Sequence, residues 1–127
     1  MSKLRNMQPI EVVIKAGIQE LFLPADSVIT GKKIVAIECF TATQMPKSPS
    51  GASSMNDTAF NDAYLTLGNG TNTPINKIPL RSLVKSNNNG MIPEIDITID
   101  TQKSKVNFNQ TTNLSAGEVL TLFVYFE

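Results

Sequence analysis

The sequence predicts an all-β protein, a two-sheet antiparallel sandwich of about eight strands with a jelly-roll-like arrangement. One reason is the C-terminal run of residues 118–126, whose apolar side chains fall on both faces of a strand. A second is the recurrence of short β-prone segments between turn signals. A third is the length of 127 residues, which suits one domain around one core.

The strand pattern is carried by residues 10–15, 18–23, 33–43, 63–67, 74–78, 95–100, 103–108 and 119–126. The first segment is rich in β-branched residues and follows Pro9, which marks a strand start or a sheet edge. In the third segment Cys39 shares a strand face with Val35 and Ile37. This position predicts that Cys39 is a small buried hydrophobe.

The later segments are separated by clear turn chemistry. Residues 68–70, Gly-Asn-Gly, predict a hairpin between the fourth and fifth segments. A short helical turn that begins at Pro79 follows them. The sixth segment alternates strictly, so Ile95, Ile97 and Ile99 are predicted to face the core.

Three stretches are predicted to be loops. Residues 26–29 are expected to tuck Val28 or Ile29 under the sheet, because β-branched residues form helices poorly. Residues 86–90 are rich in Asn. Residues 44–58 have no apolar period, and a long exposed loop of this kind is usually functional or touches a partner.

The closing strand has two rows of side chains, and a sandwich has room for only one of them inside. The hydroxyls of Thr121 and Tyr125 assign their row outward. That row is Val119, Thr121, Phe123 and Tyr125, and the inward row is Leu120, Leu122, Val124 and Phe126. The outward assignment leaves Phe123 and Tyr125 as an apolar feature on a polar exterior, which predicts a contact.

Residues 1–7 are predicted to form an N-terminal arm, and residues 8–127 a single β-sandwich domain. Eleven basic and eleven acidic residues cancel, so no whole-molecule field favours nucleic acid or an anionic membrane. No run of apolar residues reaches the roughly 20 needed to span a bilayer.

The candidate chemistry is sparse, and the sequence predicts neither an enzyme nor a cofactor site. Without any His, Cys39 has no partner for a Cys-His nucleophile pair, and the usual zinc ligand sets are missing. Asp96 and Asp100 stand roughly 13 Å apart on one strand, too far for the paired carboxylates of a glycosidase. Asp57 and Asp62 leave a calcium ion open as an alternative, although the spacing of a dedicated calcium loop is absent.

The order of strand, turn and terminal strand resembles a family of viral proteins. Residues 33–38, the hairpin of residues 64–67 leading to residues 78–80, and residues 119–126 carry the likeness. Together with neutral charge, one Cys and loops rich in Asn, Thr and Ser, they resemble the small β-sandwich or single jelly-roll proteins of bacteriophage virions, of the penton or minor capsid type. The resemblance implies a shell component that contacts its neighbours through the arm and long loops.

The function expected from these observations is a non-enzymatic structural component of a phage virion, such as a penton, minor capsid or decoration protein. Its partners would be copies of itself and other virion proteins, and it would reside in the virion after synthesis in the host cytoplasm. The predicted interface residues are Lys3, Leu4, Arg5, Met45, Met55, Phe60, Phe123 and Tyr125. The alternative is a β-sandwich module that binds a carbohydrate or a host surface.

Overall fold

The structure is a computed structural model that describes residues 6–70, 72–84 and 94–127, with side chains described from residue 97 onward in the last stretch. The strands are β1 (Asn6–Val13), β2 (Glu20–Phe22), β3 (Lys33–Cys39), β4 (Ala63–Leu67), β5 (Ile75–Pro79), β6 (Glu94–Thr98), β7 (Lys105–Phe108) and β8 (Val119–Phe126). The helical segments are the α-helix α1 (Asp57–Asn61) and the 3₁₀ helices η1 (Leu80–Leu83) and η3 (Thr101–Lys103).

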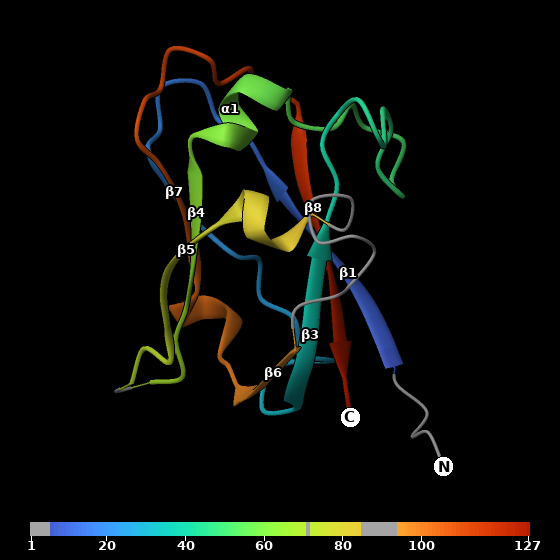
Figure 1. Ribbon diagram of the computed structural model, residues 1–127, viewed down its shortest axis with the longest axis vertical. Helices are drawn as coiled ribbons and strands as arrows, with labels where there is room; N and C mark the ends of the chain where they lie inside the picture. The colour runs from blue at the N-terminus through green and yellow to red at the C-terminus, as the bar shows by residue number, and fades with distance from the viewer. Residues whose placement is uncertain (1–5, 71, 85–93) are drawn as a thin grey trace.

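The strands form two antiparallel four-stranded sheets, in the orders β1-β8-β3-β6 and β2-β7-β4-β5. The pairing is nested, since β1 pairs with β8, β2 with β7, β3 with β6 and β4 with β5. A long hairpin rolled into two sheets in this way is a jelly roll. Figure 1 shows β7, β4 and β5 on one side, β1, β8 and β3 on the other, and α1 across the top. The prediction of a two-sheet all-β fold is confirmed.

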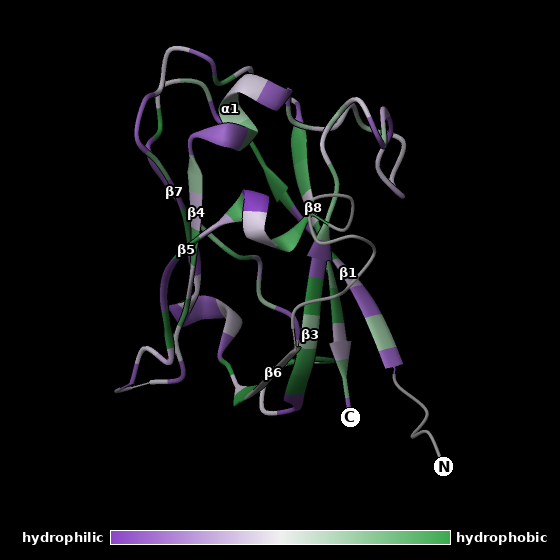
Figure 2. Cartoon of the chain, in the orientation of Figure 1, coloured by the Kyte–Doolittle hydropathy of each residue, from purple (hydrophilic) through white to green (hydrophobic). Residues whose placement is uncertain are grey.

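The core lies between the two sheets and is built from the inward rows of the strands. On β8 the inward row is the predicted one: Leu120, Leu122, Val124 and Phe126 all belong to the buried cluster. Ile99 is also buried there, whereas Ile97 is only partly buried against it because β6 is an edge strand. The side chain of Ile95 lies outside the described residues. In Figure 2 hydrophobic and hydrophilic residues both occur along strands such as β1 and β3, as expected where one face of a strand is buried and the other is not.

Two strands differ from their predicted form. β1 begins at Asn6, because β8 extends far enough to pair Asn6 with Phe126 and Met7 with Tyr125. The predicted boundary between arm and domain therefore falls inside a strand. In β3, a register shift between Ile34 and Ala36 brings Ile34 into the core cluster with Cys39, in place of Val35.

The predicted loop of residues 44–58 is partly structured, because α1 begins within it. The side chain of Asn56 caps this helix by accepting a hydrogen bond from Ala59 N–H at 2.9 Å. Ala59 and Phe60 are buried against the core. The other predicted helical turn is η1, which follows Pro79 as expected. Among the loops, Ile29 is fully buried and Val28 is exposed.

Candidate functional site

β1 is an edge strand of its sheet, and one of the backbone donors along its free side is missing. Ile14 N–H donates to the Glu118 carbonyl at 2.8 Å. In an antiparallel pair the backbone groups of successive residues point alternately toward and away from the partner strand, so this bond shows which residues of β1 point toward β8. By that alternation the backbone groups of Met7, Pro9, Glu11 and Val13 face the free edge. Pro9 has no N–H to offer there, so the edge resists the addition of another strand.

Four of the five large hydrophobic side chains that the described residues expose lie on β1, in the connection from β1 to β2, and on β2, and we call them the β1 surface. They are Met7 (46% exposed), Val13 (55%), Ile18 (45%) and Phe22 (56%). Val13, Ile18 and Phe22 line one hollow of about 510 Å³. Exposed apolar groups gathered in one place tend to mark a contact with another molecule.

A hairpin formed by residues 46–54 covers part of the outer face of the same sheet. Its base joins the sheet where Val119 N–H donates to the Ser53 carbonyl at 2.9 Å, and its tip reaches β1 where Ser50 Oγ donates to Glu11 Oε2 at 2.9 Å. The hairpin therefore crosses β8, which explains why Val119 and Thr121 are buried although they belong to the outward row. Burial raises the pKa of Glu11, but hydrogen bonds from Ser48 and Ser50 outweigh it and hold that pKa below its usual value.

The remainder of the outward row of β8 is half-buried. The Phe123 ring packs edge-to-face on Phe40, with ring centroids 5.7 Å apart. The Tyr125 hydroxyl donates to Glu38 Oε1 at 3.1 Å, and Glu38 is itself only 5% exposed. Desolvation first, and then this carboxylate, raise the pKa of Tyr125. Glu38 Oε2 is buried and accepts no hydrogen bond from a described residue.

The predicted interface residues have different outcomes. Phe123 and Tyr125 lie on the outer face as predicted, and Met45 is half-buried. Met55 and Phe60 were wrong as surface contacts, because both are fully buried in the protein's own core. Their positions next to the base of the hairpin and inside α1 explain this burial. The other three predicted contacts, Lys3, Leu4 and Arg5, lie outside the described residues.

The outer face of the other sheet carries a polar groove of about 630 Å³. Cross-strand register places the outward residues in two rows, one through Glu20, Asn107 and Tyr64 and the other through Phe22, Lys105 and Thr66. The described residues that line it are Glu20, Phe22, Thr66, Thr73, Asn76, Lys77, Gln102, Lys103, Lys105 and Asn107. This volume falls within the roughly 300–1,000 Å³ of small-molecule sites.

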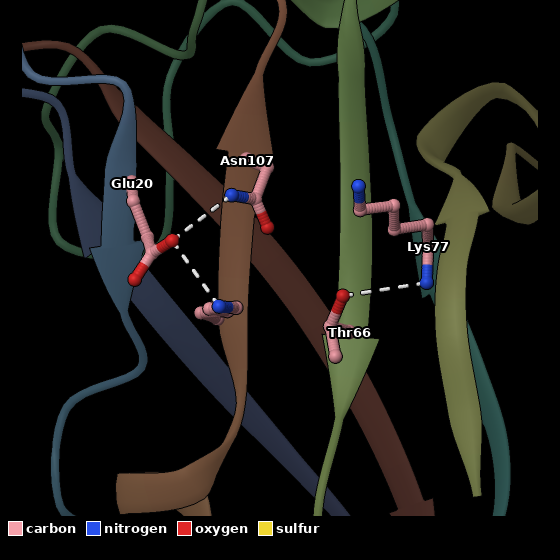
Figure 3. Close-up of polar contacts among 5 residues, drawn as sticks. Glu20, Thr66, Lys77 and Asn107 are labelled. Carbon is pink, nitrogen blue, oxygen red and sulfur yellow. Dashed lines mark hydrogen bonds and ion pairs between the residues drawn. The ribbon is translucent and has the colours of Figure 1, made fainter. Parts of the chain in front are cut away.

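One end of the groove is organised by Glu20. Its Oε2 atom accepts from Lys105 Nζ at 3.1 Å and from Asn107 Nδ2 at 3.2 Å, as Figure 3 shows. The hydrogen bond from Lys105 is the main reason that the pKa of Glu20 lies below its usual value. Lys105 Nζ also lies 5.9 Å from the centre of the exposed Phe22 ring, within reach of a cation–π contact.

The other end of the groove contains a strained residue. Lys77 has φ of 59°, the only positive φ at a non-glycine residue among those described, and this conformation costs roughly 1–2 kcal/mol. Its N–H donates to Thr66 Oγ1 at 3.3 Å. In Figure 3 the Lys77 side chain runs from β5 toward β4 instead of away from the sheet edge. The strain thus directs an ammonium group over the groove.

The other chemically notable side chains serve the fold. Burial raises the pKa of the Cys39 thiol, which donates to the Leu80 carbonyl at 3.4 Å. Asp57 accepts from the Thr43 hydroxyl at 2.7 Å, and Asp62 from Gln110 N–H at 2.7 Å. Within the part of the chain that the structure describes, no group of three or more His, Cys, Asp or Glu could hold a metal ion.

Comparisons with known proteins give no relative to guide the assignment. No family model, no curated protein and no solved structure matches the chain. No helix among the described residues is long and apolar enough to cross a membrane. The candidate sites therefore rest on their own geometry.

Sequence reasoning missed both the β1 surface and the groove. The apolar residues at Ile18 and Phe22 were assigned to an ordinary strand, because nothing in their spacing reveals that β2 is a three-residue edge. The groove joins residues far apart in the chain, from Glu20 to Asn107. One signal was available: Lys105 and Asn107 alternate with buried residues along β7. This pattern marks an outward face of the strand, but it does not say which strands lie beside that face.

Proposed function

We propose that this protein is a non-enzymatic structural component of a bacteriophage virion, of the penton, minor capsid or decoration type, which assembles with copies of itself. The single observation that carries the proposal is the β1 surface, where four large hydrophobic side chains are exposed and three of them line one hollow. Jelly rolls of eight strands are a common architecture of viral capsid domains. That association concerns the fold, and the site itself must support the function.

The chemistry of the β1 surface favours a protein partner that docks by packing. Met7 and Val13 are six residues apart on one face of β1, or roughly 20 Å at the usual strand rise. Between them the same row carries Pro9 and Glu11, and beyond Val13 the exposed apolar residues Ile18 and Phe22 line the hollow. Exposed apolar groups spread over this length suit a protein subunit better than a small ligand.

A second copy of the chain is the partner most consistent with the charges. The eleven basic and eleven acidic residues cancel, so two copies do not repel each other over long distances. Pro9 at the free edge disfavours a continuous sheet between copies. We therefore propose that the side chains of the β1 surface, and not new backbone ladders, form the contact, as in a closed symmetric assembly.

The outward rings of β8 extend this surface, and Phe123→Ser tests their part. We expect the variant to lose incorporation into particles while it remains folded, because Phe123 is only half-buried and belongs to no inward row. The measurement is co-sedimentation with assembled particles, paired with a thermal melt of the isolated protein. A variant that assembles normally, or that fails to fold, contradicts the proposed role.

A second candidate function is a module that binds a carbohydrate or a host surface. The specific observation that favours it is the polar groove on the β2-β7-β4-β5 sheet, with the strained Lys77 at one end. The β1 surface reaches Phe22 on β2, an edge strand of the sheet that carries the groove, but its other three residues lie outside the groove, so one protein can perform both functions. Phe22 lines both the hollow and the groove, and tests of each function therefore use residues that line only one.

A further inference from the structure

We propose that the groove on the outer face of the β2-β7-β4-β5 sheet binds an acidic saccharide, with Lys77 as a residue that contacts the acidic group. The inference rests on the second candidate function and names the ligand class for it. Apart from Phe22, the residues that it uses lie outside the β1 surface.

The charge of the groove favours an anion. Among the described residues, three Lys and one Glu line it, so this part of the lining has a positive net charge in a protein whose overall charge is zero. Lys105 is paired with Glu20, while Lys77 and Lys103 make no ion pair with any residue that the structure describes. Two ammonium groups are therefore left to meet a carboxylate or sulfate.

The neutral part of the lining favours hydroxyl groups. Half of the ten lining residues carry amide or hydroxyl side chains, namely Thr66, Thr73, Asn76, Gln102 and Asn107. Such groups donate and accept in the manner that suits a sugar ring. The exposed Phe22 ring at the border adds an apolar surface for the C–H face of a sugar.

Asn107 supplies a more specific indication. Its Nδ2 donates to Glu20, which fixes the orientation of the amide. The Oδ1 atom is then buried and accepts no hydrogen bond within the described part of the chain. Buried acceptors of this kind require an explanation, and a sugar hydroxyl that displaces the side chains covering this atom would supply the missing donor. A bare phosphate has no comparable set of hydroxyl donors.

The backbone of Lys77 is the second independent indication. Its left-handed conformation is strained, and strain of this kind persists where the surroundings impose it, often at binding sites. Glycine adopts this conformation without cost. The structure thus keeps a charged side chain over the groove at a position where glycine would be more stable.

Single-stranded nucleic acid fits the groove less well than a saccharide does. Stacking sites for bases use several aromatic side chains along a basic path. The described lining of the groove contains a single aromatic residue, Phe22. Nucleic acid is therefore an outcome that the experiment must separate from saccharide binding.

The test is a titration of the full chain with trigalacturonate, followed by amide NMR shifts, and repeated with maltotriose as a neutral trisaccharide of equal length. We expect trigalacturonate to shift the backbone amide of Lys77 and the side-chain amide of Asn107, and maltotriose to bind at least about tenfold more weakly. Lys77→Gly should weaken trigalacturonate binding about tenfold or more without lowering the melting temperature. Lys32→Ala, which removes an exposed charge outside the groove, is the matched control and should bind normally.

Each other outcome overturns the inference in a distinguishable way. Equal binding of the two trisaccharides would refute an acidic ligand and leave the carbohydrate module standing. Failure of both would refute the module as well. Tighter binding of an oligonucleotide, or displacement by inorganic phosphate at equal concentration, would assign the lysines to phosphate. If Lys77→Gly and Lys32→Ala weakened trigalacturonate binding equally, Lys77 would have no specific role in binding.

Discussion

The outer faces of the two sheets cover the same core but differ in chemistry. From β1, an edge of the first sheet, to β2, an edge of the second, the exposed large hydrophobic side chains are Met7, Val13, Ile18 and Phe22. Across β7, β4 and β5, lysines, amides and hydroxyls form a groove. Because the inward rows alone fill the core, the outward rows are free to differ. This difference underlies our proposal of two kinds of partner, a protein subunit at the apolar surface and a small polar ligand in the groove.

The largest loss of stability should come from a substitution in the core that lies between the two sheets. Leu122→Ala should lower the free energy of unfolding by about 2–5 kcal/mol, because Leu122 is fully buried between the sheets. Phe123→Ala, on the neighbouring outward position, should cost clearly less despite its larger side chain. Chemical denaturation of both variants measures the difference, and a reversed order would mean that the two rows of β8 are wrongly assigned.

A smaller difference in stability should distinguish the first residues of β1 from the residues that precede the strand. Deleting residues 1–7 should cost about 1–2 kcal/mol more than deleting residues 1–5, because Asn6 and Met7 pair with Phe126 and Tyr125. The shorter deletion also keeps Met7 in the β1 surface. Thermal melts of the two truncated proteins check this expectation. Identical stabilities would place the start of the domain after Met7.

A third prediction concerns the pKa of Tyr125 on the outer face of β8. Desolvation and the neighbouring Glu38 raise this pKa above the ordinary value of 10.0. Glu38→Gln should lower it, though not fully, because desolvation remains. Since the folded-state pKa is the higher one, the stability that this group contributes is present below pH 10.0 and is lost as the pH rises through the folded-state value.

The titration can be read without ambiguity, because Tyr64 is the other of only two tyrosines. The phenolate absorbance of Tyr125 is therefore followed in a Tyr64→Phe background, with and without Glu38→Gln. An unchanged titration after Glu38→Gln would show that the hydrogen bond between the two side chains does not form in solution.

The smallest effect is expected at the ion pair in the groove. Lys105 and Asn107 lower the pKa of Glu20 below its ordinary value of 4.5. The stability from this group is therefore present above pH 4.5 and is lost as the pH falls through the lower folded-state value. Because the pair is largely exposed, Glu20→Gln should change stability by less than about 1 kcal/mol at neutral pH. A larger loss, measured by denaturation across pH, would mean that the groove is more buried than its geometry implies.

The fold was predictable because alternation and turn chemistry are local signals. The period-two rows of residues 119–126 gave the correct inward side, and the Gly-Asn-Gly turn placed the β4–β5 hairpin. Strand ends were less predictable, since β1 extends to Asn6 only because β8 is long enough to pair with it. The bulge in β3 also has no local signal, because it arises from simultaneous pairing with β6 and β8.

The candidate sites were less predictable, because they depend on which outward rows become neighbours. Phe123 and Tyr125 were placed correctly on an outer face, since their strand pattern alone sets that side. Met55 and Phe60 were misplaced because a loop without apolar period concealed a capped helix that buries them. The strain at Lys77 has no sequence signal, because lysine is a rare residue at positive φ.

The central claim is that the β1 surface joins copies of this chain, and the mass of the full-length protein in solution tests it most directly. Val13→Ser and Val28→Ser make the same chemical change at valines that are 55% and 44% exposed, but only Val13 belongs to the β1 surface. We predict that the wild type and Val28→Ser sediment as the same multiple of the 13.8 kDa chain, while Val13→Ser shifts toward the single chain. A wild type that remains a single chain at every concentration, or equal masses for the two variants, would contradict the claim.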